Sequence, residues 1–421
     1  MENATMDRKT AATMEPVPGA RPHVLAAAML LSVVFGSLHA FSALVLPLQS
    51  QYQADRASIS FAYSLAILCL TGGVFASRWV LPSLGARAAA VLCGVLGAAG
   101  LIGAARGGSL AVLWAGYGLV FGGVSGVAYS LFLDRAARAL PANPGFAIGL
   151  VTAVYGGGAA ICAQWEAWMV KDGSVSALLP WLALALFAAC VLAAAGFGPD
   201  APTAAEQSVP AGDGPKTPAS GIGFFWVVYF LGATGGLMAI AHALPIVDAL
   251  APAHDLAPLA PTLNALGNVL GCLAGGLLVD RAGPRRSLVV PVAVLATSLC
   301  VLAFTVDPAL ALAGLCVCGM AYGALISAIP LVLRLRFGVA GFNKAFGLVF
   351  TAWGSAGLLG PYAAGVLYDQ TGGYRLGLAL AAGSAATALG LLWVAPDFFR
   401  SPNPETAPPA PPDRPRGGHF V

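Results

Sequence analysis

Long apolar runs, separated by short breaks that hold charged residues or Pro and Gly, occupy most of the chain. A helix needs about 20 mostly apolar residues to cross a bilayer, and each run is long enough to do so. The pattern predicts an all-α membrane protein with twelve transmembrane helices. Their expected spans are 23–49, 57–80, 86–105, 109–133, 145–169, 176–196, 222–249, 258–279, 286–305, 308–333, 343–367 and 374–396.

The predicted helices repeat as two six-helix bundles, at 23–198 and 222–397. Similar short motifs recur at an offset of 198 or 197 residues, which is hard to attribute to chance when they are spread over both halves. The paired motifs are Leu46-Pro47 with Leu244-Pro245, Gly149-Leu150-Val151 with Gly347-Leu348-Val349, and Gly122 and Gly126 with Gly319 and Gly323. Repeated halves are typical of secondary transporters.

Three polar segments flank and join the two bundles. Residues 1–22 form a polar N-terminal tail, and residues 199–221 form a linker rich in Pro, Ala, Gly and Asp. The Pro-rich residues 398–421 are expected to be a disordered tail. The N-terminus has no signal-peptide pattern, and the first apolar run is long enough to remain as a membrane helix.

Composition excludes several classes of protein. Hydrophobic residues make up 58% of the chain and charged residues only 9%, whereas soluble domains carry about 25% charged residues. The net charge of +3 comes from scattered residues, so we expect no nucleic-acid partner. The eight cysteines lie inside apolar runs and suit packing better than disulfides or metal sites. We find no catalytic constellation, cofactor motif or metal box, and expect a protein that is not an enzyme.

The basic residues set the expected topology. Only Arg56, Arg106, Lys171 and Arg375 of the 21 Lys and Arg lie on one side of the predicted helices, and the other 17 lie on the side of the two termini. The positive-inside rule therefore places both termini in the cytoplasm. We expect a multi-pass protein of the cytoplasmic (inner) membrane, surrounded by lipid and working as a monomer.

One polar break carries a recognisable motif, Gly276-Leu-Leu-Val-Asp280-Arg281-Ala-Gly283-Pro-Arg285-Arg286. It resembles the loop signature of the major facilitator superfamily, G-x-x-x-D-R-x-G-x-R-R. The resemblance implies the major facilitator fold and a cytoplasmic gate in which Asp280 pairs with nearby arginines; the simpler interpretation is a generic basic loop. The matching loop of the first half is degraded, with Ser77 in the acid's place. The expected gate residues are Arg78, Asp134, Arg135, Gly276, Asp280, Arg281, Gly283, Arg285 and Arg286.

Two further segments narrow the resemblance. Residues 36–64 and 346–369 are similar to segments of the oxalate/formate antiporter family, which is close to the monocarboxylate transporters. Dicarboxylate carriers of that family are expected to hold basic residues where this chain has Cys272 and Trp353. Every Lys and Arg lies in a loop or at a helix end, and an unpaired dianion in the middle of the membrane is costly. The sequence therefore favours a monocarboxylate, a protonated acid or a neutral solute over oxalate.

Polar residues within the helices are the candidates for binding substrate or protons. His39 and His242 lie deep in predicted helices, where an imidazole can carry a proton or simply pack against a carbonyl. Asn264 and Asn268 share one helix face and suit either a substrate or a cross-helix hydrogen bond. Tyr155 and Trp353 are related by the repeat. Weaker cavity candidates are Tyr63, Tyr117, Tyr129 and Tyr322. Glu166 and Asp248 are expected to be solvated residues at helix ends.

These observations predict a secondary active transporter for a small organic monocarboxylate, working by alternating access of its two halves. The two deep histidines suggest symport with protons. Antiport of one anion for another is the alternative mechanism, and export of neutral or hydrophobic compounds is the alternative activity. A solute-sensing receptor would need a signalling domain that the short linker and tail do not provide.

Overall fold

A computed structural model describes residues 20–141, 143–172, 174–197, 219–252 and 255–399. The predicted tails and linker at 1–22, 199–221 and 398–421 lie almost wholly outside these residues. Every regular element in the described part is helical. The elements are α1 (Pro22–Phe35), η1 (Gly36–Ala43), α2 (Val45–Tyr52), α3 (Arg56–Arg106), α4 (Leu110–Leu113), η2 (Trp114–Phe121), α5 (Gly122–Ala139), α6 (Pro144–Asp172), α7 (Val175–Gly196), α8 (Ala219–Leu250), α9 (Leu259–Phe304), α10 (Pro308–Thr371), α11 (Arg375–Val394) and η4 (Pro396–Phe399).

Three of these helices are pairs joined by a single glycine. Gly85 in α3, Gly283 in α9 and Gly338 in α10 have φ between 68° and 80° and ψ between 167° and 177°, a conformation that side chains disfavour. Within the described residues, nine helices are long and apolar enough to cross a membrane. Dividing α3 and α9 at their glycines, and counting the part of α10 beyond Gly338, gives the twelve predicted crossings. The sequence predicted a polar loop at each of these positions, whereas in the structure the two helices are joined by a single glycine.

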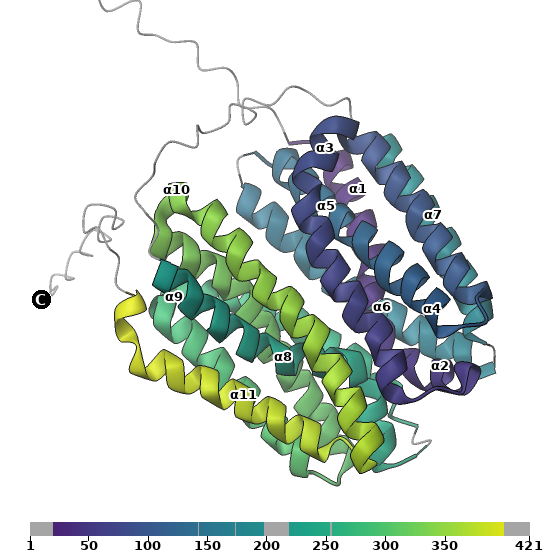
Figure 1. Cartoon of the computed structure of the whole chain (residues 1–421). Coiled ribbons are helices and arrows are strands. Elements are labelled where there is room, and N and C mark those ends of the chain that lie inside the picture. Colours follow the sequence, from purple (N-terminus) through teal and green to yellow (C-terminus); the bar gives the residue numbers. More distant parts are fainter. Residues whose placement is uncertain (1–19, 142, 173, 198–218, 253–254, 400–421) are drawn as a thin grey trace, which may run out of the picture.

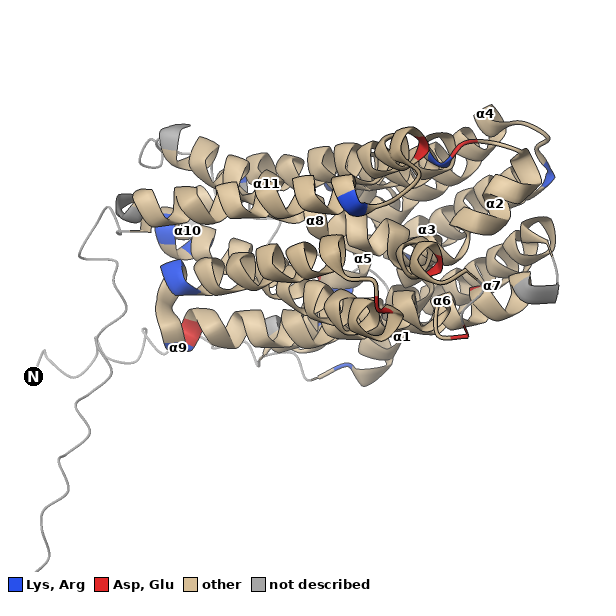
Figure 2. Ribbon diagram, turned by 90° about the horizontal axis from the view of Figure 1, so that it is seen from below, with Lys and Arg blue, Asp and Glu red and all other residues tan. Residues whose placement is uncertain are grey.

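The helices form two groups that lie side by side, α1–α7 and α8–α11 (Figure 1). We call the end with the glycine turns, Pro22 and Phe399 the proximal end. The opposite end, with the breaks at 53–55, 107–109, 305–307 and 372–374, is the distal end. Between the ends, long stretches of helix carry no charged residue (Figure 2). Exposed tryptophans mark both ends, Trp79 and Trp393 proximally and Trp168 and Trp181 distally, as in the aromatic belts of membrane proteins.

The predicted repeat is visible in the packing of glycines. A Cβ on Gly122 or Gly126 of α5 would meet the backbone of Ala66 or Leu70 in α3. The same relation holds in the second half, where Gly319 and Gly323 of α10 face the backbones of Asn264 and Asn268 in α9. Adding 198 to residues 66 and 70 gives 264 and 268. The offset found in the sequence therefore describes equivalent helix contacts, which small residues make possible.

Gly122 and its neighbour Gly123 offer a matched test of this packing. We expect Gly122→Ala to cost about 1–3 kcal/mol because the new methyl group meets the Ala66 backbone. Gly123→Ala adds a methyl group to open space, so it should leave stability unchanged or raise it slightly. Thermal unfolding of both variants in detergent measures the difference. Equal midpoints for the two variants would contradict the close α3–α5 contact.

Candidate functional site

His39 lies on the irregular part of the first membrane-spanning segment. Between α1 and α2, residues Gly36–Ala43 form the 3₁₀ helix η1. A Cβ on Gly36 would meet the backbone of Tyr155 and Ala159 in α6, so glycine permits this close approach. Pro47 has no N–H to donate to Ala43 four residues earlier. Non-α segments inside helices often mark functional sites, and this one turns the imidazole toward neighbouring rings.

Aromatic side chains from both halves surround His39. Its Nδ1 lies 2.9 Å from the hydroxyl of Tyr63 in α3. The Tyr155 ring of α6 lies 5.4 Å from the imidazole and the Trp353 ring of α10 lies 6.5 Å away, both edge-on. Trp353 Nε1 donates to the Tyr322 hydroxyl at 2.6 Å, and the Tyr129 ring lies 5.8 Å from that of Tyr155. We call these residues the aromatic cluster: His39, Tyr63, Tyr129, Tyr155, Tyr322 and Trp353.

The aromatic cluster is uncharged; four of its members are buried, and His39 and Tyr129 are half-buried. Five of its members are tyrosine or tryptophan, and within the described residues no hydrogen bond or ion pair links it to a charged side chain. The Tyr155 hydroxyl is buried without a hydrogen-bond partner there. A buried unpaired hydroxyl is unfavourable unless something else bonds to it. The cluster can therefore offer a solute one free hydroxyl, an imidazole and aromatic faces.

Three other predicted site residues have partners outside this cluster. Tyr117 packs behind it against Phe41 and Phe121. Asn264 Nδ2 donates to the Leu315 carbonyl at 2.9 Å, and Asn268 Oδ1 accepts from the Cys272 thiol at 3.4 Å. For Asn264, the geometry therefore favours a cross-helix hydrogen bond over a role in binding substrate.

His242 also lies elsewhere, in a fully buried polar group near the distal end. Its Nδ1 is 2.8 Å from the Tyr374 hydroxyl, and its Nε2 is 3.0 Å from the Pro361 carbonyl and 3.3 Å from Ser60 Oγ. A carbonyl can only accept, so Nε2 carries a proton and Nδ1 accepts from Tyr374. His242 therefore joins two halves of the molecule rather than facing the aromatic cluster.

Arg56 is the centre of this group, and the sequence had suggested only a charge at a helix end. It is 6% exposed. Its Nη1 donates to the Tyr374 hydroxyl at 3.0 Å and its Nε to Gln49 Oε1 at 2.8 Å, while its guanidinium lies 3.8 Å from the centre of the Tyr368 ring. A permanent cation is thus buried between the halves, although outside the aromatic cluster.

Asp369 of α10 completes the contact across the halves. Its two carboxylate oxygens accept from the backbone N–H groups of Arg56 at 3.0 Å and Ala57 at 2.8 Å. These are the first residues of α3, where free N–H groups and the helix dipole favour a negative charge. We call this group the distal lock: Arg56, Ser60, His242, Asp369 and Tyr374.

At the proximal end, the expected ion-pair gate is not formed. Asp280 is exposed, and no ion pair joins it to a described residue; Arg281 and Arg286 are exposed too. Arg285 instead donates to the carbonyls of Leu392 and Trp393 at the end of α11. Arg87, its counterpart 198 residues earlier, donates to the Phe197 carbonyl at the end of α7. Both arginines therefore cap the last helix of their own half.

Other predicted gate residues form contacts within their own half. Asp134 forms ion pairs with Arg135 at 3.2 Å and Arg138 at 2.8 Å on α5, and Arg78 stacks on Phe75 and Trp79. Gly85 and Gly283 share their conformation and the offset of 198. The position of Asp280 therefore corresponds to Pro82, and assigning it to Ser77 was wrong.

Glu166 contradicts the expectation of a solvated helix end. It is 1% exposed, and neither carboxylate oxygen has a hydrogen-bond partner in the described residues. The sequence suggested a boundary residue because Glu166 is close to the end of α6. Only the way in which α6 packs shows that its side chain points inward.

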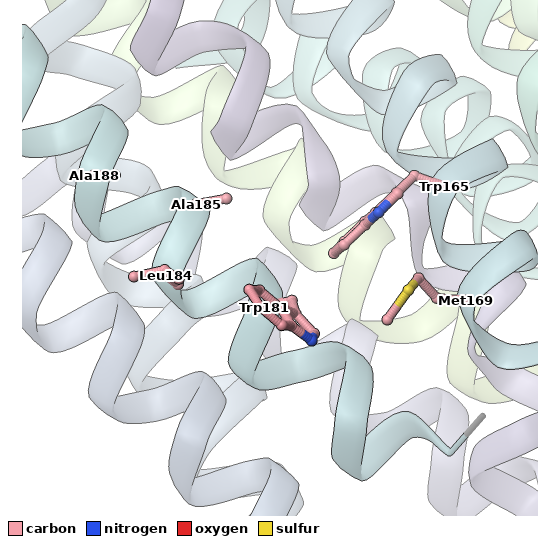
Figure 3. Close-up of a pocket in the computed structure, with 6 residues that line it drawn as sticks. All are labelled: Trp165, Met169, Trp181, Leu184, Ala185 and Ala188. Carbon is pink, nitrogen blue, oxygen red and sulfur yellow. The ribbon is translucent and has the colours of Figure 1, made fainter.

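The pocket in Figure 3 is not part of either polar group. It lies between α6 and α7 and is lined by Trp165, Met169, Trp181, Leu184, Ala185 and Ala188. Trp181 and Leu184 are among the exposed large hydrophobic residues. An open apolar groove on this face suits contact with lipid chains, so it is not a candidate for the substrate site.

Comparisons with known proteins identify the class. A family model described as Major Facilitator Superfamily matches residues 225–419. Two solved structures share the fold: a mutant of the nucleoside transporter NupG, with a TM-score of 0.72 and 15% identity over 90% of this chain and 100% of that one, and a D-xylose-proton symporter, with a TM-score of 0.73 and 15% identity over 89% and 98%. The chain belongs to the major facilitator superfamily and is a secondary transporter, not an enzyme.

Two curated proteins are also similar over most of their length. An "Uncharacterized 38 kDa protein in 23S RNA operon" from Thermoproteus tenax is 30% identical over 313 residues, which is 73% of this chain and 78% of that protein. "Monocarboxylate transporter 13" from Bos taurus is 27% identical over 398 residues, or 91% of each protein. The predicted superfamily is thereby confirmed, together with a distant relation to a monocarboxylate transporter.

Proposed function

We propose that this transporter carries a small organic monocarboxylate together with a proton, and that the aromatic cluster binds both. The observation that supports this most directly is the position of His39, the one imidazole among five uncharged rings from both halves. The similarity to a monocarboxylate transporter points to the same class of solute.

Charge matching explains why one carboxylate and one proton suit this site. A neutral cluster cannot balance an anion in a medium of low polarity. Protonation of His39 supplies one positive charge, which balances one carboxylate. A dicarboxylate would keep an uncompensated charge, because Arg56 is held in the distal lock by Tyr374 and Gln49. The free Tyr155 hydroxyl and the aromatic faces then hold the remainder of a small acid.

The distal lock gives this structure a place in an alternating-access cycle. We propose that both termini are cytoplasmic, as the distribution of basic residues indicates, so that the distal end faces outward. The hydrogen bonds that join the two halves here include Arg56 to Tyr374, Ala57 to Asp369 and Gln164 to Thr262, all toward the distal end. The conformation is therefore closed to the outside, and the halves must separate at the lock to admit solute.

Uptake into proteoliposomes tests the proposed solute class. The panel comprises labelled formate, acetate and lactate, the dicarboxylate oxalate, and the neutral solute xylose, each with and without an acidic exterior. We expect an acidic exterior to drive accumulation of at least one monocarboxylate and of neither oxalate nor xylose. Oxalate uptake, accumulation that needs a counter-anion instead of a pH gradient, or a response only to a neutral solute would reject the proposal in favour of dicarboxylate transport, exchange or neutral-solute transport respectively.

A further inference from the structure

A buried carboxyl group that the proposed cycle does not use lies in α6. Glu166 is 1% exposed, and both its oxygens are buried without a partner in the described residues. The cations that are described on α5, such as Arg135 and Arg138, lie at the proximal end and pair with Asp134. No ion pair within the described residues joins Glu166 to a positive charge that could stabilise an ionised side chain.

Glu166 lies on the same helix face as one member of the aromatic cluster. Tyr155 and Glu166 are eleven residues apart, three turns of helix, and therefore share one face of α6. That face packs on η1, because Gly36 contacts the backbone of Tyr155 and Ala159. The buried Ser42 hydroxyl of η1 also lacks a partner among the described residues. Unpaired polar groups thus extend from Tyr155 toward the distal end.

The titratable groups on the surrounding elements are few. Tyr117 of η2 and Cys162 of α6 are within electrostatic range of the Glu166 carboxyl. His39 is the titratable residue of η1, and Cys190 is that of α7. Asp255, which precedes α9, is exposed, and Tyr129 of α5 lies beside Tyr155. None of these groups is a permanent cation that could pair with a carboxylate.

An ionised carboxylate in such surroundings is strongly unfavourable. Burial of an unpaired charge costs at least several kcal/mol, whereas a protonated carboxyl loses much less. In the conformation that the structure shows, Glu166 is therefore in its neutral form. Its presence inside a membrane helix also calls for a functional reason, since ionisable residues there are costly.

The position of Glu166 ties its protonation to the distal end. Two residues before it, Gln164 Nε2 donates to the Pro258 carbonyl at 2.7 Å and to Thr262 Oγ1 at 2.8 Å, both in the opposite half. Separation of the halves at the distal lock must break these bonds and free the distal part of α6 from the opposite half. Glu166 lies on the adjoining side of α6, which packs on η1 and borders the aromatic cluster. We propose that Glu166 is a proton-binding site, which holds its proton when the distal end is closed and exchanges it with solvent when that end opens.

The direction of the pH dependence follows from linkage. The closed form binds one proton at Glu166 more firmly than the open form does, so acid stabilises the closed form and alkali favours the open form. Protonation of His242 would act in the opposite direction, because an imidazolium next to Arg56 would weaken the distal lock. The sign of the effect therefore distinguishes the two residues.

Spin labels on the two halves test this inference without any substrate. Gln51 of α2 and Val306 before α10 are exposed at the distal end, and labels at both, in a Cys300→Ser background, report its opening as a distance. We expect the open fraction to rise from about pH 5 to about pH 8 and that rise to shrink about fivefold in Glu166→Gln, which cannot ionise. Asp307→Asn, a change of an exposed distal carboxyl, is the matched control and should behave as the unmodified protein does.

Infrared difference spectra provide a second readout. A protonated carboxyl band at neutral pH should be present in the unmodified protein and in Asp307→Asn, and should be lost in Glu166→Gln. Acid-induced opening, no pH effect on the distance in the unmodified protein, or an unchanged pH effect in Glu166→Gln would each overturn the inference. Neither measurement involves a solute. A negative result for Glu166 therefore does not contradict the proposed monocarboxylate transport, and a negative transport result does not contradict proton binding by Glu166.

Discussion

Replacing Arg56 with alanine is expected to release the distal end of the molecule. The change removes the hydrogen bond to Tyr374 and the contact with the Tyr368 ring, both in the opposite half. Hydrogen bonds to charged groups contribute about 1.5–3 kcal/mol each at most, and a cation–π contact about 0.5–2 kcal/mol. Allowing for partial compensation by water, we expect a loss of about 2–4 kcal/mol, or a shift of roughly 30- to 700-fold toward the open form.

The same pair of spin labels at Gln51 and Val306 measures this shift. Arg106→Ala is the matched control, since Arg106 is an exposed arginine at the same end. Arg56→Lys keeps the charge but loses the planar fork, so an intermediate shift is expected. If Arg56→Ala left the distance distribution of the closed form unchanged, the distal lock would not be what holds these halves together.

Loss of the His39 imidazole is expected to have the largest effect on transport itself. Under the proposed function, protonated His39 forms a charge-assisted hydrogen bond with the carboxylate, worth about 1.5–3 kcal/mol. His39→Gln retains a hydrogen-bonding side chain beside Tyr63 but cannot take a proton. We expect pH-driven accumulation of the transported monocarboxylate to fall by roughly 10- to 100-fold.

Comparison with exchange transport shows whether the proton or the fold is affected. Under equal pH on both sides, solute exchange by His39→Gln should persist at a reduced rate, which establishes that the variant is folded. His23→Gln alters an exposed histidine at the start of α1 and should leave both activities intact. Undiminished pH-driven accumulation in His39→Gln would show that the proton is carried elsewhere, for which Glu166 is then the structural candidate.

The sequence was sufficient to predict the fold because hydrophobic periodicity and repetition are local properties. Twelve apolar runs and an offset of 198 describe the crossings and the Gly122–Ala66 and Gly319–Asn264 contacts without any knowledge of their arrangement. Six predicted site residues also meet in the aromatic cluster. They could be selected because polar or aromatic residues in mid-helix are few, and the repeat related Tyr155 to Trp353.

What the sequence could not provide depends on partners far away along the chain. Arg56 and Asp369 are separated by 313 residues, and each alone looks like an ordinary charge at a helix end. The same reasoning failed for Glu166, whose burial depends on how α6 packs in the fold. The Asp280 motif predicted the fold correctly. It also predicted an ion pair that this conformation does not contain, because a motif does not specify which state of the transport cycle is present.

The single-glycine turns have a consequence for how the chain enters the membrane. One residue spans at most about 3.6 Å, so the two helices joined at Gly85, Gly283 or Gly338 cannot come to rest at different depths while the turn persists. The segments 56–106, 259–304 and 308–371 are thus helical hairpins, each of which must be accommodated by the lipid as a single piece during biogenesis. Six of the twelve crossings therefore enter the membrane as three hairpins, and their pairing does not depend on contacts between the two bundles.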